Sequence, residues 1–500
     1  MKPVDPPHHP QEIELKLALP GANPAQLLKQ LSRTPILARR QPTQLQLHNV
    51  YYDTPEQHLH QQSIALRIRR VGNSAKPQWL QTLKTGKQNN SALSQRGEWE
   101  TPVPNERLSA KALKATPWTA LDPDGSLFKS LRPCFTTRFE RTIWLVRRRD
   151  GSVVEVALDV GQIVAGDQTA VICELEFELK AGQPAALFDV AQQVARSVAV
   201  LPATQSKAER GYALAQGGLA TPVRALPPKL TPDLPVLAAA QRVLSEMFCQ
   251  FTSNMNALHA SEDPEVVHQA RVGWRRFKSA CRLFRPALAP DALPSWEPLH
   301  ALLTCLGELR NLEVALTETL PPFADAYIAG NEPRARTWEA MTQALAHDAE
   351  LQRKAVRYAL RDPSLGAALL ATTQWIEGLT AVPGTVESAA LQKQSLRRWS
   401  RQRIKRLHAK YKQAFQAANT LEAQHGARIL AKRLRYCLEA LQSLLPAKRT
   451  KRWVQQATNV QSAIGVTRDF TQAMAFIARQ DLNPGLAEFL RGVAAGRSQP

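Results

Sequence analysis

The stretch Glu12-Ile13-Glu14-Leu15-Lys16, close to the start of the chain, alternates charged and apolar residues. Successive side chains of a β-strand point to opposite faces, so the carboxylates and the ammonium share one face and Ile13, Leu15 and Leu17 the other. Such a strand is often an ordinary strand with one face in solvent. Its charged face can also be the wall of a polar cavity in which a metal ion and an anion meet. The later strands distinguish these two interpretations.

Several later segments repeat this alternation of charged and apolar residues. The predicted strands lie at residues 48–55, 63–70, 79–84, 96–100, 138–144, 153–159 and 172–180. In the last of them, Glu174, Glu176 and Glu178 share a face, where like charges repel unless cations neutralise them. An antiparallel sheet with one wet face is the simpler alternative. A sheet closed into a tunnel, with its charged face inside and its apolar face under helices, explains the stacked carboxylates better.

The charged residues also predict what such a tunnel would hold. Carboxylate oxygens are the ligands that Mg²⁺ and Mn²⁺ prefer, and Arg and Lys bind phosphate oxygens, Arg in bidentate fashion. No predicted strand carries a Ser-His-Asp or Cys-His arrangement, and no G-x-x-x-x-G-K-[ST] loop occurs. We therefore expect neither covalent catalysis nor a P-loop.

Composition limits the class of protein further. A chain of 500 residues exceeds one ordinary core, so we expect two or three domains. The formal net charge of +21 implies a polyanionic partner, such as nucleic acid, polyphosphate, a phosphorylated small molecule or an acidic membrane surface. The six cysteines are dispersed without a C-x-x-C pair, as expected of reduced thiols in a cytosolic protein. We recognise no signal peptide and no apolar run long enough to span a membrane.

The second half of the chain has a different character and repeats itself. Residues 219–236 are rich in Pro and predict a linker, beyond which amphipathic helical patterns dominate. Residues 268–278 align with 425–435 in the pattern H-x-A-R-x-x-x-[RK]-R-x-[KR], and residues 307–311 align with 465–469 at nearly the same offset. This agreement at two places predicts a duplicated helical unit.

Basic residues form three stripes on the predicted helices. The stripes are His268, Arg271, Arg275, Lys278 and Arg282; His425, Arg428, Lys432 and Arg435; and Arg397, Arg401, Lys405, His408 and Lys412. A single basic stripe is usually a solvated helix face. Three stripes without interleaved acids are harder to explain in this way, because like charges one turn apart destabilise a free helix. A bound polyanion would relieve that repulsion.

The first half resembles the CYTH superfamily, also called triphosphate tunnel metalloenzymes. The resemblance rests on Glu12-x-Glu14-x-Lys16, which matches the E-x-E-x-K signature, and on motifs that follow in order. These are Tyr52-Asp53-Thr54, Leu66-Arg67-Ile68-Arg69, Lys84, Glu98 with Glu100, Arg138 with Arg141, Asp159, Glu174-x-Glu176 and Ser206-Lys207-Ala208-Glu209-Arg210-Gly211-Tyr212. The resemblance covers residues 10–218 and implies an eight-stranded antiparallel β tunnel with flanking helices, which hydrolyses or rearranges triphosphates with a divalent metal.

The resemblance also implies roles for individual residues. The implied metal ligands are Glu12, Glu14, Asp159, Glu174 and Glu176, for Mg²⁺ or Mn²⁺. The implied catalytic residues are Glu12, Glu14, Lys16, Glu174 and Glu176. The implied phosphate contacts are Arg67, Arg69, Lys84, Arg138, Arg141 and Lys207, together with Lys16. A water oriented by metal or carboxylate would be the nucleophile.

The second half resembles the CHAD domain, an all-helical module of two pseudo-symmetric four-helix halves. The resemblance covers residues 237–495 and implies binding of inorganic polyphosphate in a basic pocket between the halves. The expected polyphosphate-binding residues are His268, Arg271, Arg275, Arg276, Lys278, Arg397, Arg401, Lys405, His425, Arg428, Lys432, Arg433 and Arg435. Asn311 departs from the usual Asp of the first copy, which weakens a salt-bridge role there, whereas Asp469 keeps the acid in the second copy.

Together these features predict an α+β protein with a tunnel domain, a Pro-rich linker and a helical domain. We expect a metal-dependent inorganic triphosphatase that splits tripolyphosphate to pyrophosphate and phosphate and binds inorganic polyphosphate. The alternatives are thiamine triphosphatase or class IV adenylate cyclase activity in the same tunnel, or a polyphosphate-binding scaffold with an inactive tunnel. We expect a cytoplasmic protein associated with polyphosphate granules, without a membrane or nucleic-acid partner.

Overall fold

The computed structural model describes residues 11–72, 76–86, 90–288, 293–379, 394–479 and 484–497. The chain forms two compact units. Unit 1 contains residues 1–221 and 361–374, and unit 2 contains residues 222–360 and 375–500.

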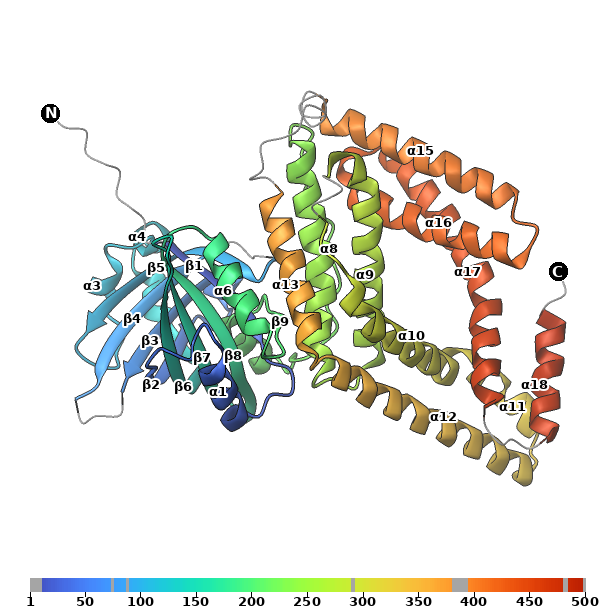
Figure 1. Ribbon diagram of the computed structural model, residues 1–500, viewed down its shortest axis with the longest axis horizontal. Helices are drawn as coiled ribbons and strands as arrows, with labels where there is room; N and C mark the ends of the chain where they lie inside the picture. Colours follow the sequence, from blue (N-terminus) through green and yellow to red (C-terminus); the bar gives the residue numbers. More distant parts are fainter. Residues whose placement is uncertain are drawn as a thin grey trace. The chain divides into compact units, whose positions relative to one another are not determined.

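Unit 1 is built on an antiparallel sheet that closes on itself (Figure 1). The strands are β1 (Gln11–Ala18), β2 (Thr43–Asp53), β3 (Ile64–Val71), β4 (Gln78–Thr85), β5 (Leu93–Val103), β6 (Arg132–Arg147), β7 (Val153–Ala165), β8 (Gln168–Ala181) and β9 (Leu201–Pro202). Their order is β5-β4-β3-β2-β6-β7-β8-β1-β9, and a further pairing of β5 with β1 closes the ring. The predicted eight-stranded antiparallel tunnel is confirmed, with β9 as a short addition beside β1.

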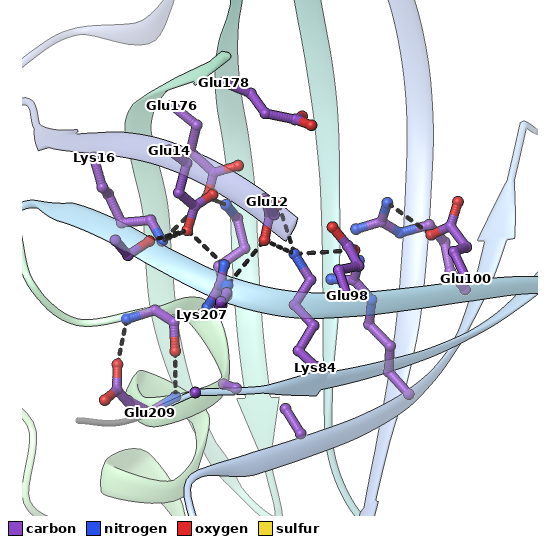
Figure 2. A pocket seen from close by; sticks show the side chains of 18 of the residues that line it. Glu12, Glu14, Lys16, Lys84, Glu98, Glu100, Glu176, Glu178, Lys207 and Glu209 are labelled. Atoms are coloured by element: carbon purple, nitrogen blue, oxygen red, sulfur yellow. Dashed lines mark hydrogen bonds and ion pairs between the residues drawn. The ribbon is translucent and has the colours of Figure 1, made fainter. Parts of the chain in front are cut away.

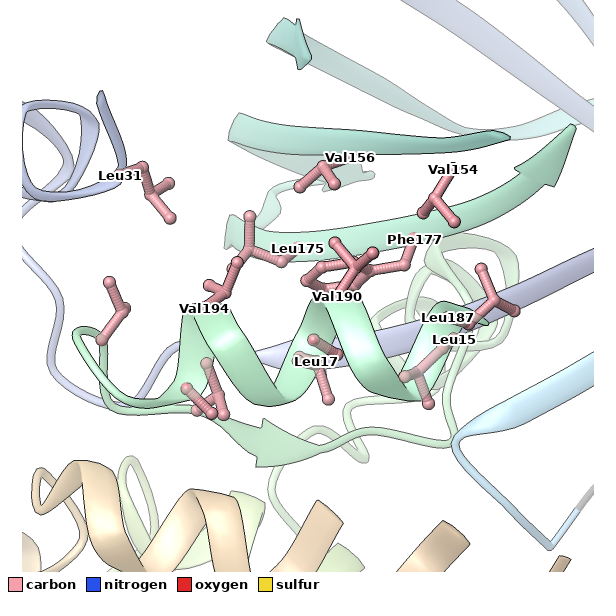
Figure 3. Packing of buried hydrophobic residues seen from close by; sticks show 14 of the residues in the cluster. Leu15, Leu17, Leu31, Val154, Val156, Leu175, Phe177, Leu187, Val190 and Val194 are labelled. Atoms are coloured by element: carbon pink, nitrogen blue, oxygen red, sulfur yellow. The ribbon is translucent and has the colours of Figure 1, made fainter. Parts of the chain in front are cut away.

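Alternation along each strand separates the two faces of this barrel. On β1, Leu15 and Leu17 are fully buried outside the barrel, where they contact the helix α6 (Ala185–Ala195). Figure 3 shows Leu187, Val190 and Val194 of α6 against Leu175 and Phe177 of β8. Each such side chain contributes roughly 1.5–3 kcal/mol when it is fully removed from water. The outer apolar layer therefore holds the barrel closed and forces the alternate, charged side chains inward.

Shorter helices complete unit 1. They are α1 (Pro24–Arg33), α2 (His58–Gln61), α3 (Ala110–Leu113), α4 (Trp118–Leu121), α5 (Ser126–Ser130) and α7 (Lys207–Ala215). Helix α7 begins with a capping box, in which the Ser206 hydroxyl accepts from the Glu209 amide and the Glu209 carboxylate accepts from the Ser206 amide. This cap fixes the start of α7, at Lys207.

Residues 361–374, distant in sequence, are also part of unit 1. They include the first part of helix α13 (Pro363–Gly378). Leu370 is fully buried in the same apolar cluster as α6, and Gln192 donates a hydrogen bond of 3.2 Å to the carbonyl of Ala367. A β-carbon at Gly366 would lie 2.4 Å from the Val200 carbonyl oxygen, so only glycine permits this close packing. The predicted helical domain of 237–495 contains this segment in sequence, but the segment packs in the core of unit 1.

Unit 2 is helical. Its helices are α8 (Val236–Leu258), α9 (Pro264–Phe284), α10 (His300–Val314), α11 (Ala324–Ile328), α12 (Glu332–Ala359), α15 (Leu396–Gln416), α16 (Leu421–Ala440), α17 (Ala447–Ile477) and α18 (Pro484–Arg497). Helices α9 and α16 carry the two copies of the sequence repeat, and each begins at a side-chain cap, Asp263 for α9 and Thr420 for α16. None of the described helices is long and apolar enough to cross a membrane.

Candidate functional site

The barrel of unit 1 encloses a cavity of about 970 Å³ whose wall is densely charged. Figure 2 shows carboxylates and ammonium groups that enter this space from several strands. The charged residues that line it are Glu12, Glu14, Lys16, Arg67, Arg69, Lys84, Arg96, Glu98, Glu100, Arg141, Glu155, Glu176, Glu178, Lys180, Lys207 and Glu209. The volume is at the upper end of the range for small-molecule sites, and the lining suits a small polyanion with cations.

Strand register places charged residues of β1 directly beside charged residues of β8 in this wall. Lys16 of β1 lies opposite Glu176 of β8, and Glu14 lies opposite Glu178. The Lys16 ammonium is 3.1 Å from Glu14 and 3.5 Å from Glu176. Buried charges are costly unless they are paired, so the inward-facing carboxylates of β1 and β8 require the cations that β1, β4, β5, β6 and α7 supply.

One group of ion pairs lies around β1 and β5. Lys84 is 2.8 Å from Glu12 and 3.1 Å from Glu98, while Arg96 is 2.9 Å from Glu12 and 2.5 Å from Glu14. Burial alone would raise the pKa of Glu12, but Lys84 and Arg96 outweigh it and hold that pKa below its ordinary value. Burial likewise opposes the ionisation of Glu98, whose pKa Lys84 and Arg67 nevertheless lower. These carboxylates are therefore ionised and already neutralised by protein cations.

A second group of carboxylates lies where β7 and β8 meet α7. Asp159, Glu174 and Glu176 each offer an oxygen within 4.8 Å of the others. Arg141 binds Asp159 through two nitrogens, at 2.6 and 2.7 Å, and Glu176 at 2.5 Å. Burial opposes the ionisation of Glu176, but Lys207 and Arg141 hold its pKa well below the ordinary range. We call these three acidic residues the carboxylate triad.

The carboxylate triad fits a divalent cation. Three carboxylate oxygens within 4.8 Å of one another are the kind of ligand set that Mg²⁺ and Mn²⁺ prefer. The structure therefore brings together three of the five predicted metal ligands. Glu12 and Glu14 lie in the other group, where Arg96 occupies both, and their role as metal ligands stays a prediction.

Two of the predicted phosphate contacts, Arg67 and Arg69, enter the cavity from β3. Arg67 donates to the hydroxyl of Tyr51 at 3.4 Å, and Arg69 donates to the side-chain carbonyl of Asn49 at 2.8 Å. Burial, followed by the charges of Arg67 and Arg141, lowers the pKa of Arg69 to about 10. Arg67 and Arg141 thus place like charge close to Arg69, and a bound anion would offset this repulsion.

Arg138 was predicted as a phosphate contact, and the structure corrects its position. It is exposed and is absent from the residues that line the cavity, whereas Arg141 lines it. The two arginines are three positions apart on β6, and an odd separation places side chains on opposite faces of a strand. Arg138 instead lies near His48, whose pKa is lowered by burial and by the charge of Arg138.

Sequence reasoning missed residues that hold the charged groups in place. Arg96 joins Glu12 to Glu14, and Arg210 binds Glu174 at 2.9 Å. Alternation with Glu98 on β5 was a signal that Arg96 points inward. Tyr51 and Asn49, which orient the two arginines of β3, carried no such signal because neutral residues do not mark a charged face.

Unit 2 brings basic residues from both copies of the repeat together. Burial and then the charges of Arg275, Arg428 and Arg468 lower the pKa of Lys432 to about 6. Burial and then Arg310 lower the pKa of His268 to about 4. The Nε atoms of Arg275 and Arg428 are buried without a hydrogen-bond partner among the described residues. The stripes of α9 and α16 therefore meet in one cationic cluster.

The glycine of the second repeated motif has a physical role in this cluster. A β-carbon at Gly307 of α10 would lie 2.9 Å from a guanidinium nitrogen of Arg271. Glycine thus lets the Arg271 side chain lie against the helix. Asn311 stands where the first copy of the repeat usually has an Asp, and its side chain donates a hydrogen bond of 3.0 Å to the Gln472 side chain. Asp469, at the equivalent position of the second copy, faces Arg428 and Lys432.

The other predicted polyphosphate-binding residues lie in different surroundings. Arg276 and Arg435 both pair with Glu439 at 3.4 Å. Arg433 is half-buried, and the exposed residues are Lys278, Arg397, Arg401, Lys405 and His425. Polyphosphate binding by these residues stays a prediction.

Comparison with known proteins agrees with this geometry. Family models match a CYTH domain at residues 10–212 and a CHAD domain at residues 242–478. An inorganic triphosphatase of Haemophilus influenzae is 38% identical over 205 residues, which are 41% of this chain and 55% of that protein. The chain thus spans about half the length of this curated relative.

Solved structures resemble each unit separately. The crystal structure of the CHAD domain from the plant Ricinus communis is 26% identical, covers 56% of this chain and 93% of that one, and gives a TM-score of 0.47. A Hippeastrum protein, described as an adenylyl cyclase with a dominant triphosphatase activity, is 19% identical. The match covers 41% of this chain and 96% of that one, with a TM-score of 0.29. On the family matches, the chain belongs to the proteins that carry a CYTH domain followed by a CHAD domain.

Proposed function

We propose that this protein is a divalent-metal-dependent inorganic triphosphatase that splits tripolyphosphate into pyrophosphate and phosphate inside the barrel of unit 1. The observation that carries the proposal is a cavity of about 970 Å³ in which inward-facing arginines lie beside a carboxylate triad. A highly charged triphosphate needs both a cationic cradle and neutralisation of the charge that develops during an in-line displacement.

Different residues of the cavity wall would bind the phosphate groups and hold the metal ion. Arg67 and Arg69 would bind phosphate oxygens, since Tyr51 and Asn49 already fix their orientation. A divalent ion held by the carboxylate triad would supply Lewis-acid polarisation of a phosphoryl oxygen and lower the pKa of a bound water. Arg141 would hold Asp159 and Glu176 in place for this ion.

The aromatic residues of the cavity favour an inorganic substrate over a nucleotide or a thiamine ester. Among the described lining residues, the aromatic rings are those of Tyr51, His60 and Tyr212. Tyr51 stacks on Phe135 at 4.6 Å between centroids, and His60 stacks on Tyr212 at 4.1 Å. Because each of these rings is already engaged, a purine or thiazole would find a poor stacking surface.

A substrate panel tests this proposal. The full chain is incubated with Mg²⁺ or Mn²⁺ and tripolyphosphate, ATP, thiamine triphosphate or long polyphosphate, and phosphate release is measured. We expect the highest kcat/KM for tripolyphosphate and no turnover by Glu176→Gln or after chelation of the metal. Preference for ATP or thiamine triphosphate would overturn the substrate, and no turnover with any compound would favour a scaffold role.

We also propose that unit 2 binds inorganic polyphosphate through the cationic cluster of α9 and α16. The support is the meeting of buried, partly unpartnered basic groups from both copies of the repeat. Arg275→Glu and Lys432→Glu should abolish binding of long polyphosphate without stopping tripolyphosphate hydrolysis. Lys354→Glu makes the same charge change on the exposed face of α12 and serves as the control, so it should bind polyphosphate like the wild type. If Arg275→Glu and Lys432→Glu bind polyphosphate as well as Lys354→Glu does, the proposal is contradicted. Such binding would bring the protein to polyphosphate granules in the cytoplasm.

A further inference from the structure

The ammonium group of Lys207 lies in the middle of the carboxylate triad. Its Nζ is 2.6 Å from Asp159, 2.5 Å from Glu174 and 2.9 Å from Glu176. The side chain is only 7% exposed. Lys207 and Glu176 line the cavity, whereas Asp159 and Glu174 are absent from the residues that line it. A path from the cavity to those two carboxylates is therefore covered by the Lys207 side chain.

The backbone position of Lys207 makes this ammonium dependent on the triad. Lys207 is the first residue of α7, and the amino end of a helix carries partial positive charge that disfavours a cation. Burial disfavours the charged form as well, and the three carboxylates within 2.9 Å of Nζ offset both effects. The lysine thus remains a cation because the carboxylate triad surrounds it.

The local charge count identifies which cation must leave when a metal ion enters. Asp159, Glu174 and Glu176 contribute three negative charges, and Lys207, Arg141 and Arg210 contribute three positive ones. Lys16 lies 3.5 Å from Glu176 but is closer to Glu14, at 3.1 Å, and is counted with that carboxylate. A divalent ion added to these three carboxylates and three cations would leave a buried excess of two positive charges. Departure of one protein cation would halve that excess.

Lys207 is the cation that can move. Arg141 is fixed by paired hydrogen bonds to Asp159, and Arg210 is fixed by Glu174 and by the Val171 carbonyl. Lys207 has a flexible four-carbon stem and borders the open cavity.

We propose that the Lys207 ammonium occupies the divalent-cation position of the carboxylate triad in the metal-free protein, and that metal entry displaces it into the cavity. Displaced there, the ammonium is available to a phosphate oxygen of the substrate. Lys207 therefore couples the two events, because it becomes a phosphate ligand only after the metal is in place. This second step rests on the proposed triphosphatase function, whereas the displacement itself does not.

Mn²⁺ binding measured without any phosphate compound tests the displacement. Free Mn²⁺ is followed by electron paramagnetic resonance during titration of the full chain. Lys207→Met should bind Mn²⁺ about tenfold or more tightly than the wild type, because the ion no longer competes with a protein cation. The matched control is Lys180→Met, which removes the same charge from the same cavity but pairs with Glu178 and Glu155; its affinity should be close to the wild-type value. Circular dichroism confirms folding, and Lys207→Gln replaces Lys207→Met if the latter does not fold.

Three results would overturn the proposal: unchanged or weaker binding by both Lys207 variants, an equal gain from Lys180→Met, or no Mn²⁺ binding by any protein. The outcome is separate from the substrate panel. If the Lys207 variants bind Mn²⁺ more tightly but no protein releases phosphate, the displacement is supported and the triphosphatase function is rejected. If the wild type releases phosphate but the Lys207 variants have unchanged Mn²⁺ affinity, the triphosphatase function is supported and the displacement is rejected.

Discussion

Replacement of Arg96 by Met should destabilise the barrel strongly at neutral pH and much less in acid. Arg96 lies 2.9 Å from Glu12 and 2.5 Å from Glu14, whose side chains are only 8% and 4% exposed. Removing one partner of a buried ion pair costs about 3–5 kcal/mol. Lys84 stays 2.8 Å from Glu12 and Lys16 stays 3.1 Å from Glu14, so we expect a loss near the lower limit, about 3 kcal/mol.

The pH dependence follows from the pKa shifts of the two carboxylates. Burial opposes their ionisation, but Lys84 and Arg96 for Glu12, and Lys16 and Arg96 for Glu14, hold both pKa values below 4.5. Their pairing therefore stabilises the fold above pH 4.5, and this contribution is lost as the pH falls through the depressed values. Without Arg96 the carboxylates protonate more easily, so the deficit of the variant should shrink below pH 4.5.

Hydrogen exchange of peptides from β1 and β5, together with urea unfolding at pH 7 and pH 4, measures this deficit. Arg96→Lys keeps the charge and should retain most of the stability. Arg107→Met removes an exposed charge beyond β5 and should change the free energy of unfolding by less than about 0.5 kcal/mol. Wild-type stability of Arg96→Met at pH 7, or a deficit of equal size at both pH values, would refute the reasoning.

Other substitutions test separate parts of the structure. Arg141→Ala should lower kcat/KM for tripolyphosphate by about 10²-fold or more, whereas Arg138→Ala, on the outer face, should leave it within about twofold of the wild type; equal losses in the kinetic assay would contradict the strand geometry. A bound polyanion should raise the pKa of Lys432 from about 6, so polyphosphate affinity measured by calorimetry should fall as the pH rises from 5 to 8, and a flat profile would count against the cluster. Gly273→Ala should lower the stability of unit 2 by about 1–3 kcal/mol, because its β-carbon would lie 2.7 Å from the Phe251 amide nitrogen. Gly426→Ala in α16 meets nothing within 4 Å and should raise stability by about 0.5–1 kcal/mol in the same thermal unfolding experiment.

Alternation made much of the barrel predictable from sequence. A period of two determines which side chains share a face, so the inward positions of Glu12, Glu14 and Lys16 followed from β1 alone. The same rule excludes a shared face for Arg138 and Arg141, whereas the resemblance implied phosphate contacts for both. The position of Lys207 inside the triad depends on how α7 packs on β7 and β8, which no local pattern encodes.

The helical half shows the same limit. The repeat predicted that α9 and α16 are equivalent, but the environments of their leading histidines differ: His268 is half-buried and His425 is exposed. The assignment of residues 361–374 to unit 1 was not predicted either. An apolar helix face does not reveal what it will pack against, since any complementary apolar surface removes it from water equally well.

The packing of residues 361–374 in unit 1 has a consequence for protein synthesis. A ribosome makes residues 1–221 and then all of 222–360 before the segment that contains Leu370 emerges. The nascent barrel therefore exposes the apolar site of Leu370, beside α6, throughout this interval, at a stage when folding intermediates are prone to aggregate. The chain can complete its first core only after about half of its second unit, residues 222–360, has been translated, so the barrel reaches its final packing during synthesis of the helical unit.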